Sequence, residues 1–218
     1  MSIAWKQIET VMFDMDGTLL DLAFDNFFWR EAVPQAWARL HDHPTEQAKH
    51  LLKPHFQQHE GSLNWYCLSF WSQTLGMDLE SLKQQHKHRI ALRAGVHDTL
   101  DALKKAGKTL WLVTNAHPAV LQIKLEKTHL AEHFSQIISS HHLGFAKEQA
   151  EFWTAMQAQY QFSPASSLLI DDSEPVLHAA KAFGLQVQGI RQPDSLLPPR
   201  ANLHYPALDH LTDLLKNL

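Results

Sequence analysis

The sequence has a single cysteine, Cys67, among its 218 residues. One cysteine excludes a disulfide within the chain and fits a protein that stays in a reducing compartment. Long apolar stretches are also missing, and none approaches the length that spans a membrane. The chain starts with MSIAWKQIET, which lacks the charged start and apolar run of a secretory signal. We therefore expect a cytoplasmic, soluble protein with no membrane partner.

An excess of basic residues is absent as well. Lys and Arg number 19 against 23 Asp and Glu, for a formal net charge of −4. Binding to nucleic acid depends on many cationic contacts to phosphates, so this balance argues against a nucleic-acid partner. A mildly acidic protein that binds an anion must concentrate its few cations and backbone amides locally. With 44% hydrophobic residues, the chain can form one sizeable core and a small appended domain.

Short apolar runs that are typical of strands recur along the chain and alternate with helical patterns. Strands are predicted at 11–13, 109–113, 137–139, 168–170 and 187–190. Helices are predicted at 96–106, 119–127, 148–160, 174–183 and 207–215. This alternation favours a parallel sheet that is covered by helices on both faces. The expected fold class is therefore α/β.

One stretch interrupts the alternation directly after the first strand. Residues 22–94 contain no convincing strand and carry helical patterns at 26–40, 45–58, 63–75 and 79–92. We expect a helical cap domain at 22–94 and a core domain formed by 1–21 and 95–218. Ligands of open α/β sheets bind at the carboxyl ends of the strands. An insertion at that edge can act as a lid that excludes water and contacts the substrate.

Two carboxylates follow the first strand. Residues 11–20 read VMFDMDGTLL and place Asp14 and Asp16 two positions apart. Like charges that converge in a turn repel each other unless a cation or a shared proton lies between them, and Mg²⁺ prefers such oxygen ligands. A carboxylate can attack phosphorus, and a neighbouring carboxylic acid can protonate the leaving alkoxide. A simple Asp-Gly turn at the end of a strand is the structural alternative.

Three further polar groups follow later strands. Thr114 and Asn115 end the second strand, where they can bind a phosphoryl oxygen or cap a helix. Lys147 is predicted at a helix start after the third strand, where it can neutralise a phosphoryl group or remain a surface charge. Asp171 and Asp172 follow the fourth strand, where they can complete an oxygen site for Mg²⁺ or cap a helix.

The predicted cap is rich in aromatic side chains, and its second half contains Phe56, Trp65, Tyr66, Phe70 and Trp71. Aromatic faces can stack on a nucleobase, although helical spacing of such residues is also typical of a core. Four basic residues near the end of this stretch are interpreted as ordinary helix-surface charges: Lys83, Lys87, Arg89 and Arg93.

The four groups occur in the order, and at the strand ends, of the four motifs of the haloacid dehalogenase (HAD) superfamily, which the chain resembles outside the helical insertion. The resemblance implies a Rossmann-like core with helices on both faces and an inserted helical cap. It also implies a phosphomonoester hydrolase in which Asp14 is the nucleophile and Asp16 the general acid and base. Thr114, Asn115 and Lys147 would bind the phosphate, with Lys147 also catalytic.

The resemblance further implies Mg²⁺ as the cofactor. The ligands would be Asp14, the backbone carbonyl of Asp16, and the acids of the fourth motif. That motif reads IDDS where the family pattern has glycine before the aspartate. Asp172 is therefore favoured as a direct ligand, and Asp171 as a direct or water-mediated one. Relatives that release halide lack the second aspartate of the first motif, so Asp16 favours phosphoryl chemistry.

A closer resemblance is carried by five strings that include cap segments: DMDGTLLDLAFDNFFW, LNWYC, TNAHP, KLEKT and DDSE. Together they are similar to bacterial purine 5′-nucleotidases of this superfamily that hydrolyse GMP and IMP. Candidates for base recognition, by position and chemistry alone, are Asn26, Trp29, Asn64 and His117. Two alternatives stay open: a small-molecule phosphatase of the phosphoglycolate type and a sugar phosphomutase, which shares all four motifs. A scaffold without activity would be expected to lack a catalytic carboxylate, and none is missing.

Overall fold

The centre of the molecule is a parallel sheet in a computed structural model that describes residues 3–216 and 218. Its strands are β1 (Thr10–Phe13), β2 (Thr109–Thr114), β3 (Gln136–Ser139), β4 (Ser167–Asp171), β5 (Gln186–Ile190) and β6 (Ala207–Leu208). They pair in the order β3-β2-β1-β4-β5-β6. β1 lies between β2 and β4, and its register pairs Phe13 with Leu112 and with Ile170. The predicted α/β class with a parallel sheet is confirmed.

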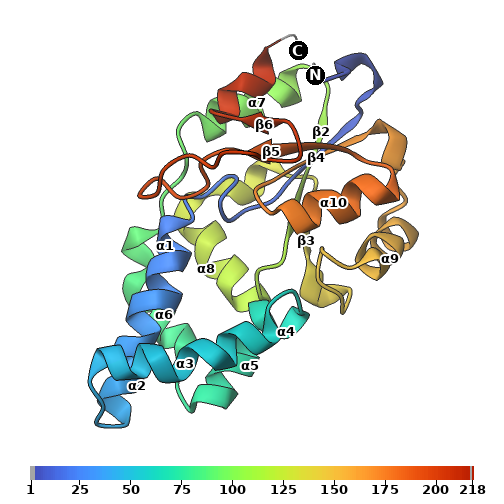
Figure 1. The fold of residues 1–218 in the computed structure, drawn as a ribbon. Coiled ribbons are helices and arrows are strands. Elements are labelled where there is room, and N and C mark those ends of the chain that lie inside the picture. The colour runs from blue at the N-terminus through green and yellow to red at the C-terminus, as the bar shows by residue number, and fades with distance from the viewer. Residues whose placement is uncertain (1–2, 217) are drawn as a thin grey trace.

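Helices cover both faces of the sheet, because successive strand side chains point to opposite sides. Val11 and Phe13 pack with α7 (Val96–Lys105) and α8 (Pro118–Thr128) in one buried cluster. Met12 belongs to a second cluster, formed with α9 (Ala150–Tyr160) and α10 (Glu174–Phe183). Figure 1 shows α9 and α10 on the right of the sheet, away from α7 and α8. The strands are therefore buried on both faces, which leaves their ends as the places where a ligand could reach the sheet.

Between β1 and α7 the chain forms the helical insertion, Ala23–Arg89, which contains no strand. Its elements are α1 (Ala23–Phe27), a π-helical turn (Phe28–Ala32), α2 (Val33–Leu40), α3 (Thr45–His59), α4 (Leu63–Tyr66), α5 (Leu68–Leu75), α6 (Leu79–His86) and a 3-10 turn (Lys87–Arg89). Figure 1 shows these helices, blue to teal, gathered at one end of the molecule. Within the described residues, no helix is long and apolar enough to cross a membrane.

The helical insertion has a buried cluster of its own, which includes Phe28, Leu52 and Trp71. Val120 of α8 belongs to the same cluster. Because α8 also packs on the sheet, it is one of the elements that join the insertion to the rest of the molecule. Phe28 and Trp71 are almost fully buried, so the insertion is a packed unit rather than a set of loose loops.

Several boundaries differ from those that the sequence predicts. Pro54 lies inside α3 without ending it, and Cys67 separates α4 from α5. The Cys67 backbone is extended, and its sulfur accepts a hydrogen bond from the Phe70 amide, so it caps the second helix. The predicted helix at 207–215 is wrong. Its first two residues pair with β5 as strand β6, and only a 3-10 turn follows at Leu211–Leu215.

We expect Leu100→Ala to destabilise the fold strongly. Leu100 lies on the buried face of α7 with no exposed surface, and its truncation leaves a cavity against the sheet. The expected loss in the free energy of unfolding is about 2–5 kcal/mol, measured by urea denaturation. Leu196→Ala is the matched control, because Leu196 is 77% exposed. It should change the free energy by no more than about 0.5 kcal/mol. Equal effects would contradict the assignment of the core.

Candidate active site

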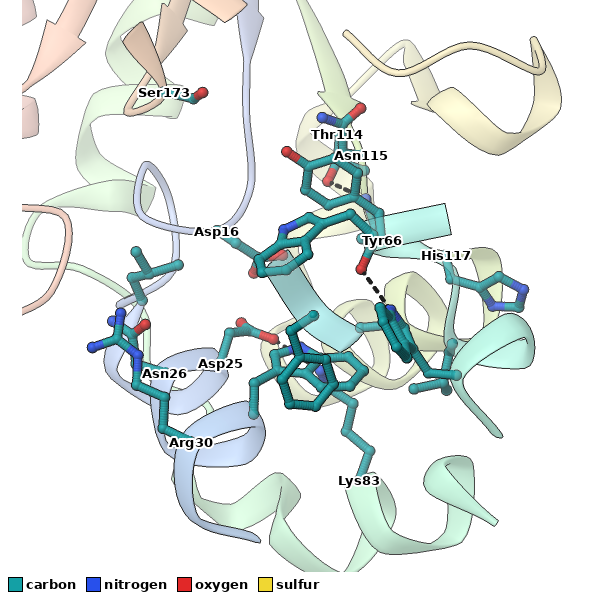
Figure 2. A pocket seen from close by; sticks show the side chains of 18 of the residues that line it. Asp16, Asp25, Asn26, Arg30, Tyr66, Lys83, Thr114, Asn115, His117 and Ser173 are labelled. Carbon is teal, nitrogen blue, oxygen red and sulfur yellow. Dashed lines mark hydrogen bonds and ion pairs between the residues drawn. The ribbon is translucent and has the colours of Figure 1, made fainter. Parts of the chain in front are cut away.

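A cavity of about 700 Å³ lies between the carboxyl ends of the strands and the helical insertion. All seven residues that the sequence singles out for chemistry line it: Asp14, Asp16, Thr114, Asn115, Lys147, Asp171 and Asp172. The insertion contributes the opposite wall, which includes Trp29, Phe56, Trp65, Tyr66 and Lys83. Figure 2 shows Asp16 on one side of this space and Thr114 and Asn115 on another. Side chains far apart in the sequence are thus brought to one place by the order of the strands.

The loop after β1 turns sharply directly beyond the first aspartate. The Asp14 amide still donates to the Ile170 carbonyl of β4, at 2.9 Å, and so continues the sheet. Gly17 then adopts a φ of +87°, a conformation that side chains with a Cβ rarely adopt. A Cβ at Gly17 would also lie 2.7 Å from Cγ of Asp172. Glycine at this position therefore permits both the turn and the close approach of Asp172.

Lys147 lies at the centre of the charged groups. It is found in a turn three residues before α9 rather than at the helix start, so the predicted helix at 148–160 begins too early. Its Nζ donates to Asp14 Oδ1 at 2.5 Å, Asp171 Oδ2 at 2.7 Å and the Val113 carbonyl at 2.9 Å. Burial lowers the pKa of Lys147, but the charges of Asp14 and Asp171 outweigh burial and raise it. The side chain is therefore a buried cation.

Three carboxylates form a cluster that fits a hard cation. Oxygens of Asp14, Asp171 and Asp172 lie within 4.8 Å of one another. Asp171 already accepts hydrogen bonds from Lys147 on Oδ2 and from the Ser173 amide on Oδ1. The Asp172 carboxylate has no hydrogen-bond partner within residues 3–216 and 218. Oxygen donors of this kind suit Mg²⁺, and Asp14 and Asp172 have the oxygens that are not already taken.

The electrostatics of the cluster indicate unbalanced negative charge. Burial, and then the neighbouring charge of Asp171, raise the pKa of Asp14 to about 7, although Lys147 opposes the shift. Burial and the charges of Asp171 and Asp14 raise the pKa of Asp172 well above its ordinary value. A single buried lysine thus does not neutralise three carboxylates, and a bound cation would offset the remainder.

Asp16 does not join this cluster. Its Oδ1 accepts a hydrogen bond from Lys124 Nζ at 2.6 Å, and the same ammonium donates to Asp25 Oδ2 at 2.7 Å. Asp25 in turn binds Lys83 Nζ at 2.8 Å. The interpretation of Lys83 as a surface charge is wrong, because it is only 2% exposed. Lys87 and Arg89 are exposed as expected, whereas Arg93 is half-buried and donates to the carbonyls of residues 192 and 193.

Lys124 and Asp25 were not singled out from the sequence, but a signal for the lysines exists. Lys124 follows Val120 by four positions and Lys83 follows Leu79 by four, so each lies on the apolar face of its helix. All four of these residues are buried. A lysine on an apolar helix face indicates a buried partner of opposite charge.

The two residues after β2 are engaged with neighbouring polar groups. Thr114 Oγ1 accepts from the Ala116 amide at 3.0 Å. Asn115 donates to Glu148 Oε2 at 2.9 Å and accepts from the Lys147 amide at 3.0 Å. The Tyr66 hydroxyl, from the helical insertion, donates to the other oxygen of Glu148. Asn115 therefore fixes the Lys147 turn and is joined to the insertion through Glu148.

The base-recognition candidates lie in different environments. Trp29 lines the cavity and packs edge-on against Phe56 and Trp71. Asn26 donates to Asp194 at 2.6 Å, and His117 is bonded to Ser69 at 2.7 Å, so both have partners. Figure 2 shows His117 at the edge of the view, beyond Tyr66. Asn64 is exposed and does not line the cavity.

Residues 8–184 match the family model described as haloacid dehalogenase-like hydrolase. The GMP/IMP nucleotidase YrfG of Escherichia coli is 38% identical over all of this chain and 99% of its own length. A phosphoglycolate phosphatase of Pseudomonas putida is 26% identical over 83% of this chain and 68% of its own.

Solved structures share the fold. A HAD phosphatase from Thermococcus onnurineus superposes with a TM-score of 0.80 at 20% identity, over 96% of this chain and 97% of its own. An L-2-haloacid dehalogenase from Xanthobacter autotrophicus gives a TM-score of 0.65 at 19% identity, over 96% and 97% of the two chains. Both likenesses extend through the helical insertion as well as the sheet.

We expect the metal-free protein to lose stability as pH rises. The folded-state pKa of Asp14, about 7, lies above its ordinary value of 3.8, so the folded protein binds this proton more tightly than the unfolded chain. Its contribution is fully present below about pH 4 and is lost as pH rises through about 7. Thermal unfolding in EDTA should therefore give a lower Tm at about pH 8 than at about pH 5.

Mg²⁺ supplies the complementary measurement, because its ligands must be deprotonated. Millimolar Mg²⁺ should raise the Tm more at the higher pH than at the lower. Asp14→Asn removes one titrating group and should flatten the pH dependence of the EDTA samples. A variant with the same pH dependence as the wild-type protein would contradict the assignment of this proton to Asp14.

Proposed function

The chain belongs to the haloacid dehalogenase-like hydrolases, and from that premise we propose that it is a Mg²⁺-dependent 5′-nucleotidase that hydrolyses GMP and IMP. The observation that carries the reaction type is the cluster at the strand ends, where buried Lys147 binds both Asp14 and Asp171. The purine substrate rests on the full-length similarity to a GMP/IMP nucleotidase and on the walls of the cavity.

The reaction divides into two displacements at phosphorus. An oxygen of the Asp14 carboxylate attacks, the bond from phosphorus to the ester oxygen breaks, and Asp16 gives the departing alkoxide a proton. The Asp14 side chain then carries the phosphoryl group as an acyl-phosphate. Asp16, now ionised, takes a proton from a water molecule that attacks phosphorus. The bond from phosphorus to the Asp14 oxygen breaks, inorganic phosphate leaves, and both aspartates return to their starting states.

Positive charge and hydrogen-bond donors assist both steps. Lys147 offsets the charge of the phosphoryl oxygens, and Thr114 and Asn115 lie beside it at the end of β2 to bind them. Asp14, the Asp16 backbone carbonyl and Asp172 would hold Mg²⁺. Asp171 is less available to the ion, because its two oxygens already accept hydrogen bonds from Lys147 and Ser173. When bound, the ion supplies positive charge that stabilises the transferring phosphoryl group.

The helical insertion is proposed to act as a cap domain, spanning residues 22–94, that closes over the substrate and contacts its base. The cavity, about 700 Å³, is larger than a two-carbon phosphate needs. Its far wall carries aromatic rings from the insertion, among them those of Trp29, Phe56 and Trp65. Aromatic faces stack on nucleobases, so this wall favours a nucleotide over phosphoglycolate or a hexose phosphate.

The proposal predicts phosphate release with a clear preference for purine monophosphates. With Mg²⁺, the kcat/KM for GMP and IMP should exceed that for AMP, pyrimidine monophosphates, phosphoglycolate and hexose phosphates. Asp14→Asn keeps the shape of the nucleophile but cannot form the acyl-phosphate, and it should release no phosphate above background. A preference for a small phosphate would agree with the proposed hydrolysis of phosphomonoesters but would contradict the purine nucleotide as substrate. Turnover by Asp14→Asn would overturn the covalent mechanism.

Trp65 is the aromatic side chain that we expect to stack on the base. It lines the cavity and forms no aromatic pair within the described part of the chain, so no neighbouring ring competes with a base for stacking on it. Trp65→Ala should raise the KM for GMP by about tenfold, since stacking on one base contributes about 1–3 kcal/mol. The KM for p-nitrophenyl phosphate, which has no purine base, should change far less. An equal rise for both esters would indicate damage to the cavity instead.

A further inference from the structure

Four side chains of alternating charge, two buried lysines and two partly buried aspartates, connect the loop after β1 to the helical insertion. Asp16 binds Lys124 at 2.6 Å, Lys124 binds Asp25 at 2.7 Å, and Asp25 binds Lys83 at 2.8 Å. Lys124 and Lys83 are 1% and 2% exposed. Figure 2 shows Asp16, Asp25 and Lys83 in succession along one side of the cavity. Each buried charge has a partner of opposite sign, so the set is electrically balanced without help from the metal cluster.

The members of this set come from both parts of the molecule. Lys124 belongs to α8, which packs on the sheet, whereas Asp25 belongs to α1 and Lys83 to α6 of the helical insertion. Asp25 accepts from both lysines, one on each carboxylate oxygen. Without Asp25, Asp16 would be the one carboxylate of this set left to balance the ammonium groups of Lys124 and Lys83. The position of Lys124 therefore depends on a residue of the insertion.

The arrangement fixes the orientation of Asp16. Lys124 holds Oδ1, while Oδ2 has no hydrogen-bond partner within the described residues and Asp16 lines the cavity. A carboxyl group that is held at one oxygen presents the other in a fixed direction. A general acid needs this, because its proton must lie within hydrogen-bond reach of the leaving oxygen.

We propose that Lys124 is a positioning residue for Asp16 and that Asp25, supported by Lys83, makes this positioning depend on the helical insertion. The inference rests on the proposed function, since it concerns the acid of that same reaction. Lys124 acts through Asp16 and does not touch the substrate. The acid would be correctly placed only when α1 and α6 are seated against α8.

The leaving group provides the test. When an alkyl ester such as GMP is cleaved, the bond from phosphorus to oxygen breaks and the alkoxide must receive the proton of Asp16. When p-nitrophenyl phosphate is cleaved, the same bond breaks but the phenolate is stable enough to depart without a proton. The kcat/KM reports the steps up to the departure of the leaving group, and the later attack of water is common to both esters. Misplacing Asp16 should therefore lower kcat/KM for GMP selectively.

The experiment compares kcat/KM for GMP and for p-nitrophenyl phosphate, with Mg²⁺, in the wild-type protein and in Lys124→Met. The expected loss with GMP is about a hundredfold, in keeping with the contribution of a positioned acid. The loss with the aryl ester should be at least about tenfold smaller. Equal losses with the two esters would overturn the inference. A wild-type protein that hydrolyses neither ester would instead overturn the proposed function.

A double variant protects the test from a failure to fold. It combines Asp25→Leu with Lys83→Met and so removes one acid and one base together, which leaves no additional buried charge without a partner. If the inference holds, this pair should show the same selective loss with GMP. A pair variant with wild-type kcat/KM for both esters would show that the insertion does not position Asp16.

Thr128→Val is the structural control. Thr128 is buried on the same helix as Lys124, and its hydroxyl donates to the Lys124 carbonyl at 2.7 Å, whereas the hydrogen bond to Asp16 comes from the Lys124 side chain. It should perturb α8 without distinguishing the two esters. A selective loss with GMP in Thr128→Val would mean that any disturbance of α8 produces the signature, and this would overturn the specific role of Lys124.

Discussion

The contact on which the rest of the site depends is that of Lys147 Nζ with Asp14 and Asp171. Carboxylates at the ends of adjacent parallel strands repel each other once they are buried, and the chain places two such strands, β1 and β4, side by side. One ammonium group between them makes the arrangement possible. The turn that carries Lys147 is itself fixed by two side chains. The Asn115 side chain accepts a hydrogen bond from the Lys147 amide, and the Trp153 indole donates one to the Lys147 carbonyl.

Lys124, the second buried lysine that binds an aspartate of the first motif, has a different role from Lys147. Lys147 lies within the carboxylate cluster and offsets charge where the phosphoryl group would bind. Lys124 lies outside the cluster and binds Asp16 away from it. The two aspartates of the first motif, only two positions apart, thus each bind a different cation. Separate partners suit a reaction in which one carboxylate must attack while its neighbour must be able to give and take a proton.

The sequence predicted the sheet well because its information is local. Apolar strands followed by Asp14, Thr114 and Asp171 are visible in the letters, and parallel strands bring such residues to one edge. The helix at 207–215 failed because its first residues pair with β5, a contact that no local pattern records. Asp25 and Glu148 escaped notice for the same reason, because each has its role only through a partner on another element. The apolar helix face marks Lys124 as buried, but its partner Asp16 precedes it by 108 positions and no local pattern identifies it.

The position of the helical insertion along the chain has a chemical consequence. Because it follows the loop of Asp16 directly, α1 brings Asp25 back to the lysine that holds Asp16. A second polar connection runs from Tyr66 of the insertion through Glu148 to Asn115, whose side-chain oxygen accepts a hydrogen bond from the backbone amide of Lys147. One connection therefore reaches Asp16, the proposed acid, and the other reaches the turn that carries Lys147. One helix, α4, takes part both in the aromatic wall of the cavity and in the second connection, because it carries Trp65 of the wall and Tyr66 of that connection. Under the proposed function, contact with the substrate and placement of the reacting groups are thus coupled, because any movement of the insertion would alter both.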